Sequence, residues 1–155
     1  MPEWHFKEQA ILKIAYWLMS LNSWDKLKRY TWVPIPPSKA KSDLAYDDRL
    51  FRILMKVKEL EKSLDLRELI LRKTSRDAAH MPGGKRPTIQ ELSADLYVDE
   101  AITDPTPEGI VVFDDVITSG ASFKAVQSLL QNRYTTTPIV GIFVARNIKV
   151  ITDMD

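Results

Sequence analysis

Apolar residues recur at intervals of three and four along several segments of the chain, and this spacing predicts amphipathic helices. Thr88 followed by Glu91 has the pattern of a capping box, which marks the start of a short helix. Ser122 is expected to cap the helix that comes after it, because a serine hydroxyl suits this position. The predicted helices span positions 5–21, 47–64, 88–95 and 123–131.

Five runs of β-branched, aromatic and aliphatic residues predict strands. The run Ile110–Phe113 is apolar at every position, which is typical of a strand buried on both faces of a parallel sheet. Because these runs alternate with helices, we expect an α/β fold, with a doubly wound, mainly parallel five-stranded sheet and helices on both faces. The predicted strands span positions 29–34, 69–72, 96–98, 110–115 and 138–145.

Length and composition predict one domain. The chain has 155 residues, of which 45% are hydrophobic, so residues 1–155 can form a single packed core. Cysteine is absent, which excludes disulfides, thiolate metal sites and thiol catalysis. No apolar run approaches the ~20 residues of a membrane span, and the amino terminus lacks the pattern of a signal peptide. We therefore expect a soluble, cytoplasmic protein.

The charge is unevenly distributed although its sum is small. The formal net charge is +1, which argues against a protein dedicated to coating nucleic acid or to binding membranes through a polybasic segment. Positions 26–86 carry 16 Lys and Arg against 8 Asp and Glu, whereas the final third is acidic. A phosphorylated, metal-bound ligand could bind between these two regions. An ordinary solvated surface explains the same distribution equally well.

The segment that follows the apolar run 110–113 combines acidic and hydroxyl side chains. Gly120 allows a tight turn among the hydroxyls of the segment 118–122, and such a turn at a helix start suits a phosphate group. Asp114 and Asp115 would repel that phosphate, so we expect them to accept hydrogen bonds from another part of the same ligand, such as sugar hydroxyls. A nearby divalent cation would offset their charge. A phosphorylated ribose meets all these requirements, and the alternative is an acidic strand end with a helix cap.

The run from Ile110 to Ser122 resembles the phosphoribosyl pyrophosphate motif of type I phosphoribosyltransferases, and the chain is most similar to the ComF-like branch of that family. The resemblance implies that Asp114 and Asp115 are catalytic residues that hold the ribose 2′- and 3′-hydroxyls. It also implies that they contact Mg²⁺ mostly through those hydroxyls and water, and that the following turn binds the 5′-phosphate. The substrate-binding residues implied by the motif are Val116, Ile117, Thr118, Ser119, Gly120, Ala121 and Ser122.

Three further segments are similar to parts of the same family. The run "VPIPPSKAK" lies where these enzymes keep a pyrophosphate loop, and Ser38 and Lys39 are its candidates, with Lys41 behind them. Arg72, at the end of a predicted strand, is a candidate catalytic residue because its planar guanidinium fits pyrophosphate oxygens. Residues 73–87 correspond to a flexible lid and residues 88–98 to a small hood, while residues 1–25 form an amino-terminal helix outside the shared core. The candidate lid contacts are Arg76, His80, Lys85 and Arg86.

Alternatives remain for these segments. The loop after the first strand also suits a surface loop stiffened by proline, and His80 also suits an exposed loop position. The hood varies so much within the family that it identifies no acceptor.

The resemblance implies a Mg²⁺-dependent enzyme that transfers the 5-phosphoribosyl group from phosphoribosyl pyrophosphate to a nitrogen base and releases pyrophosphate. Enzymes that act on 6-oxopurines usually carry Asp where Thr118 stands, so hypoxanthine and guanine are disfavoured as acceptors. Dimers are common among the proteins that the chain resembles, and neither a membrane nor directly bound nucleic acid is expected as a partner.

Two other functions stay open. One is a sensor or regulator that binds a phosphoribosyl ligand without turnover. The other is a ComF-like accessory protein linked to nucleic-acid processes, in which the aromatic residues of "WDKLKRYTW" would stack on bases. Trp24, Leu27 and Trp32 in this run are more often core residues.

Overall fold

The structure is a computed structural model that describes residues 3–37, 40–44, 46–74, 88–117 and 120–146. The helices are α1 (Glu3–Met19), α2 (Trp24–Leu27), α3 (Arg49–Leu60), α4 (Ile89–Ala94), the 3₁₀ helix η2 (Glu100–Ile102) and α5 (Ala121–Arg133). The strands are β1 (Thr31–Pro34), β2 (Asp65–Leu66), β3 (Ile70–Arg72), β4 (Leu96–Val98), β5 (Ile110–Ile117) and β6 (Ile139–Arg146).

The main sheet is parallel and has the strand order β2, β1, β5, β6. Strand β5 lies between β1 and β6, and Phe113 pairs with Pro34 on one side and Ile142 on the other. Since the strands run in one direction, their carboxyl ends share one edge. Residues Ile110–Phe113 are completely buried, at 0% exposure, which confirms the prediction of a strand covered on both faces.

The expected five-stranded sheet is not seen in the described residues. The predicted strand at 69–72 exists as β3, but it pairs antiparallel with β4 in a separate two-stranded sheet. Each pairing extends by one backbone bond, because Arg67 N–H donates to Trp32 O of β1 at 3.0 Å and Asp99 N–H, after β4, donates to Leu69 O at 2.8 Å. The chain from β2 to β3 therefore pairs first with β1 and then with β4.

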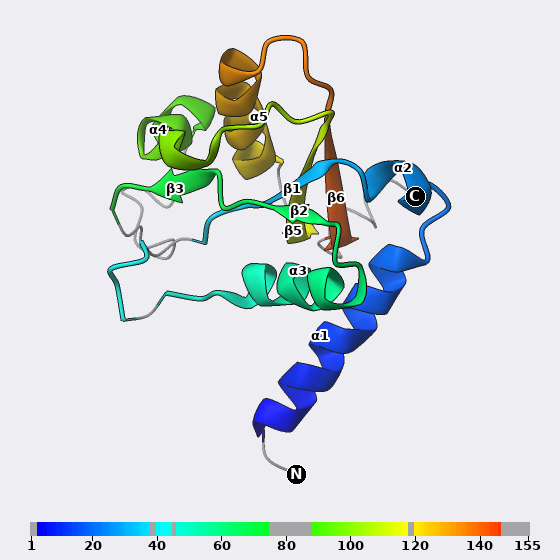
Figure 1. Ribbon diagram of the computed structural model, residues 1–155. Helices are drawn as coiled ribbons and strands as arrows, with labels where there is room; N and C mark the ends of the chain where they lie inside the picture. The colour runs from blue at the N-terminus through cyan, green and yellow to red at the C-terminus, as the bar shows by residue number, and fades with distance from the viewer. Residues whose placement is uncertain (1–2, 38–39, 45, 75–87, 118–119, 147–155) are drawn as a thin grey trace, which may run out of the picture.

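Helices cover both faces of the main sheet, as predicted (Figure 1). On one face, α1 and α3 pack against Trp32 of β1 and Phe113 of β5. On the other face, α5 packs against Val33 and Val112, the neighbouring positions of the same two strands. Successive strand residues point to opposite faces, so each strand contributes to both cores. No helix in the described ranges is long and apolar enough to cross a membrane.

The aromatic residues of "WDKLKRYTW" belong to the core. Trp24 is 8% exposed, Leu27 is 7% exposed and Trp32 is 0% exposed. The Trp32 indole N–H donates to Leu27 O at 2.8 Å, and the Trp24 and Trp32 ring centroids lie 5.7 Å apart. These side chains are therefore not available to stack on nucleic-acid bases in this structure.

The starts of two helices test the predicted caps. Thr88 Oγ1 accepts a hydrogen bond from Glu91 N–H at 3.1 Å, so the predicted cap of α4 is confirmed. The predicted cap of α5 is wrong, because Gly120 is the N-cap and Ser122 lies inside the first turn. Gly120 has φ = 80°, a left-handed conformation that glycine adopts at little cost, so the helix begins earlier than expected.

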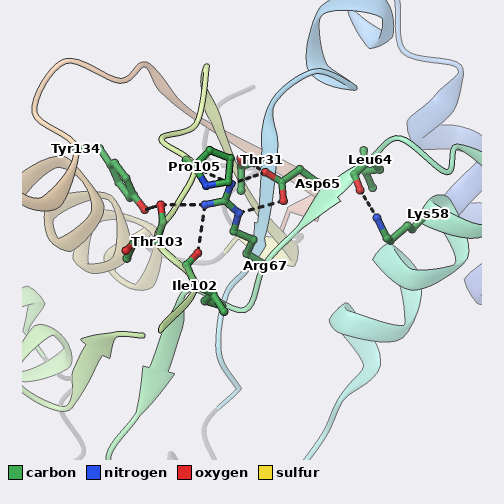
Figure 2. Close-up of polar contacts among 9 residues, drawn as sticks. All are labelled: Thr31, Lys58, Leu64, Asp65, Arg67, Ile102, Thr103, Pro105 and Tyr134. Carbon is green, nitrogen blue, oxygen red and sulfur yellow. Dashed lines mark hydrogen bonds and ion pairs between the residues drawn. The ribbon is translucent and has the colours of Figure 1, made fainter. Parts of the chain in front are cut away.

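A buried polar cluster around Arg67 ties β1 and β2 to the segment before β5 (Figure 2). The Arg67 side chain is 8% exposed and forms two bonds to the Asp65 carboxylate, at 3.0 and 2.8 Å. It also donates to three backbone carbonyls. These belong to Ile102, Thr103 and Pro105, at 3.2, 3.0 and 2.8 Å. All five guanidinium N–H donors thus have acceptors.

Candidate functional site

Two of the segments singled out by the sequence meet at the carboxyl edge of the main sheet. Asp114 and Asp115, called the acid pair below, follow Phe113 in β5 and are partly buried. The chain that leaves β1 stays beside β5, since Ile35 N–H donates to Phe113 O at 2.9 Å. Ligands of doubly wound sheets bind at this edge. The segment after β1, residues 35–37, which we call the proline segment, and the acid pair are therefore neighbours in a position suited to a ligand.

Asp115 of the acid pair forms an ion pair with a cation on α3. Arg49 Nη2 lies 2.6 Å from Asp115 Oδ2, and the two side chains are 58% and 25% exposed. Asp114 Oδ1 accepts the backbone N–H of Asp115 at 2.8 Å, which fixes the direction of that carboxylate. Because Arg49 is largely solvated, its ion pair is weak and can exchange with another donor. The acid pair can thus accept hydrogen bonds from a ligand while Arg49 offsets part of its charge.

The amino terminus of α5 follows the acid pair along the chain. Gly120 makes the left-handed turn, and Lys124 N–H donates to Gly120 O at 2.9 Å to close the first helical turn. Ala121 and Ser122 are the first residues of this 13-residue helix. The start of a helix carries a partial positive charge and suits an anion. Val116 and Ile117 pair with β6, whereas Thr118 and Ser119 lie outside the described residues.

A cleft of about 550 Å³, measured with its solvent-open mouth, lies beside the proline segment. We call it the Glu68 cleft. Its lining includes Pro36, Leu50, Phe51, Glu68, Arg72 and Tyr97. Ile35 and Asp48 also line it, whereas Arg49, Asp114 and Asp115 are not part of its lining. The cleft is therefore linked to the acid pair through the neighbours of these residues, since Ile35 is bonded to Phe113 and Arg49 follows Asp48.

Glu68 is held by two donors in this cleft. Lys41 Nζ lies 3.0 Å from Glu68 Oε1, and the Tyr46 hydroxyl donates to Oε2 at 3.3 Å. Burial, followed by the negative charge of Glu68, raises the pKa of Tyr46 to about 12. The Tyr46 hydroxyl therefore stays protonated, and remains a donor, throughout the physiological range.

Arg72 connects the proline segment to the carboxyl end of α4. Its Nε donates to Pro37 O at 2.8 Å, and its Nη1 donates to Asp95 Oδ2 at 3.0 Å. Burial alone would raise the pKa of Asp95, but hydrogen bonds from Thr74 and Arg72 outweigh burial and lower it. The Arg72 side chain is 7% exposed. Arg72 thus lies next to the predicted pyrophosphate loop, and its contact with a ligand stays a prediction.

Several predicted site residues lie outside the described residues. They are Ser38, Lys39, Arg76, His80, Lys85 and Arg86. The structure also brings in three positions that sequence reasoning missed: Tyr46, Arg49 and Glu68. Glu68 directly precedes the apolar run Leu69–Leu71 of "LRELILRK", and this position next to a predicted strand was a usable signal for it. Nothing in the local sequence distinguishes Tyr46 or Arg49 from ordinary residues near a helix start.

The acid pair fits Mg²⁺ only as part of a ligand set shared with substrate. Among the described residues, no group of three or more His, Cys, Asp or Glu side chains could hold a metal ion. Mg²⁺ prefers oxygen ligands and usually keeps several waters, with one or two carboxylates and substrate oxygens completing its shell. Asp114 and Asp115 could supply such carboxylates, directly or through water.

Comparison with known proteins adds no assignment. The chain matches no protein-family model, and no curated protein is significantly similar to it in sequence.

Proposed function

We propose that the protein transfers the 5-phosphoribosyl group from phosphoribosyl pyrophosphate to a nitrogen base, with Mg²⁺, and releases pyrophosphate. The supporting observation is that two carboxylates in the central strand are followed along the chain by a helix start. Asp114 and Asp115 lie at the carboxyl part of β5, and the glycine-initiated helix α5 follows within a few residues. A type I phosphoribosyltransferase-like fold, in which α4 and β4 form the hood, is part of this proposal.

The acid pair and the start of α5 bind different parts of the ligand. The carboxylates accept hydrogen bonds from the two ribose hydroxyls, and the positive end of the helix binds the 5′-phosphate. Arg49 weakens the repulsion between the acid pair and the phosphate. A carboxylate has about four lone-pair sites, so Asp115 can accept a ribose hydroxyl while it keeps Arg49 nearby.

In the reaction, the bond from ribose C1′ to the pyrophosphate oxygen breaks and its electron pair leaves with pyrophosphate. A bond from the base nitrogen to C1′ forms, and the proton of that nitrogen passes to water. Positive charge develops on the sugar, and the negative acid pair stabilises it. Mg²⁺, when bound, neutralises charge on the leaving pyrophosphate. Arg72 donates a hydrogen bond to Pro37 O in the predicted pyrophosphate loop, and its contact with the leaving group is part of this proposal.

Pyrophosphate release tests this proposal. Wild-type protein is incubated with phosphoribosyl pyrophosphate, Mg²⁺ and each of a panel of purine and pyrimidine bases. We expect base-dependent release with at least one base, and a loss of at least about 100-fold in Asp114→Asn/Asp115→Asn because two interactions made in the transition state are removed. Asp25→Asn is the matched control, since the Asp25 side chain is 97% exposed. No release with any base contradicts the enzymatic assignment.

A phosphoribosyl-binding sensor is the second candidate, and the position of Arg72 favours it. Its guanidinium is tied to Asp95 and Pro37 and is mostly buried, so it is engaged in the fold before any ligand binds. A sensor would bind phosphoribosyl pyrophosphate without turning it over. Saturable binding without pyrophosphate release would support this candidate.

A further inference from the structure

The Glu68 cleft has a composition that the phosphate chemistry does not explain. Its volume of about 550 Å³ includes the mouth that opens to solvent, so the cleft is accessible to a ligand from outside. Prolines, Leu50 and Phe51 supply apolar walls, and Tyr97, which is 41% exposed, supplies an aromatic surface. Such walls suit a flat ring rather than a strongly hydrated anion.

The charges in the cleft also disfavour an anion. Three carboxylates line it, from Asp47, Asp48 and Glu68, against two cations, Lys41 and Arg72. Both cations are already close to carboxylates, since Lys41 pairs with Glu68 and Arg72 with Asp95. A pyrophosphate group placed beside Glu68 in this cleft would therefore meet net repulsion. A neutral ligand that carries N–H donors would not be repelled by these carboxylates, and its donors could form hydrogen bonds with them.

Glu68 is the group that such donors would meet. Its side chain is 21% exposed, so it is partly desolvated yet accessible. The salt bridge with Lys41 and the hydrogen bond from Tyr46 fix one partner on each carboxylate oxygen, and further lone pairs remain for a ligand. A hydrogen bond to a charged group in a partly desolvated site is stronger than a neutral one.

We propose that the Glu68 cleft binds a planar nitrogen heterocycle, with the Glu68 carboxylate accepting its ring or amino N–H groups and Tyr97 lying against its face. Resting on the proposed function, this ligand is the acceptor base, because Ile35 lines the cleft and its N–H donates to Phe113 O, directly before the acid pair, so the cleft lies near the ribose site at the sheet edge. Glu68 is then the residue that selects acceptors with N–H donors.

The test measures base binding in the absence of phosphoribosyl pyrophosphate. Adenine, guanine, cytosine and uracil are titrated into the full chain by calorimetry, together with benzoate, a flat anion without N–H groups. At least one base is expected to bind saturably, and benzoate is not. Glu68→Gln should weaken base binding at least tenfold, because it replaces a charged acceptor by an amide. Glu59→Gln, the same change at a side chain that is 62% exposed, should leave it within twofold.

A second variant keeps the test decisive if Glu68→Gln disturbs the fold. Tyr97→Ala leaves the carboxylate and its two donors intact, and loss of the stacking surface should weaken base binding about tenfold. Absence of binding by every base, equal binding of benzoate, or equal base affinities in wild type and in both variants would overturn the proposal.

Titration of the same samples with phosphoribosyl pyrophosphate and Mg²⁺ separates the two proposals. Glu68→Gln should bind it within twofold of wild type. Glu68-dependent base binding without phosphoribosyl pyrophosphate binding would refute the proposed function and leave the cleft assignment standing. Phosphoribosyl pyrophosphate binding with Glu68-independent base binding would refute only the cleft assignment.

Discussion

Two arginine–aspartate pairs in this protein differ in what surrounds them. Arg67, paired with Asp65, is 8% exposed, and its remaining donors all reach backbone carbonyls. Arg49, paired with Asp115, is 58% exposed and begins α3, directly after Asp48 of the cleft lining. The same two residue types therefore form a buried structural pair around Arg67, in which every donor is used, and a solvent-exposed pair at Arg49, which can exchange partners. A binding site needs a solvent-exposed pair, because a ligand must reach acceptors that the fold leaves accessible.

Removal of the Arg67 guanidinium should have the largest effect on stability. Arg67→Met would leave the Asp65 carboxylate and three carbonyls without their buried donor, so the free energy of unfolding should fall by about 3–5 kcal/mol. Urea denaturation measures this loss. A decrease below about 1 kcal/mol would show that the Arg67 cluster does not stabilise the connection of β1 and β2 to the segment before β5.

The Tyr46–Glu68 contact should make stability depend on alkaline pH. Since the pKa of Tyr46 is raised from 10.0 to about 12, the folded state holds the proton that the unfolded state loses first. Its contribution to stability is complete below pH 10 and disappears as pH rises towards 12. The free energy of unfolding of Tyr46→Phe should fall less over this interval than that of wild type, as measured by denaturation at a series of pH values. Parallel pH dependences would contradict the raised pKa.

Replacement of the exposed arginine should have the smallest effect on stability. Arg49→Ala removes a solvated ion pair, so the free energy of unfolding should change by less than about 1 kcal/mol. The same denaturation experiment as for Arg67→Met provides the measurement. Equal losses of stability in Arg67→Met and Arg49→Ala would contradict the distinction between the buried Arg67 pair and the solvent-exposed Arg49 pair.

Periodicity and composition predicted much of the fold. The long helices and the central strand follow from local apolar patterns, and the alternation of elements predicted a parallel sheet with covered faces. Strand β2 was missed because its two residues, Asp65 and Leu66, carry no pattern. The antiparallel pairing of β3 with β4 was missed because it depends on contacts between distant segments. Gly120 replaced Ser122 as the cap because backbone conformation, rather than hydroxyl chemistry, sets the start of α5.

The sequence predicted the candidate site only where the functional residues are adjacent in the chain. The acid pair and the following turn occupy one short run, so strand order alone locates them at the carboxyl edge of the sheet. Glu68 and its partners Lys41 and Tyr46 come together only through folding, since Tyr46 and Glu68 are 22 positions apart. Acceptor recognition built from such contacts leaves little local signal in a single sequence.

Calorimetric titration of phosphoribosyl pyrophosphate with Mg²⁺ tests the central claim most directly, because the claim concerns a ligand held at both its diol and its phosphate. Wild-type protein should bind saturably, and Asp114→Asn/Asp115→Asn should lower the affinity at least about 100-fold while Asp25→Asn leaves it unchanged. Wild-type affinity in the double variant would contradict the assignment of this sheet edge as a phosphoribosyl site.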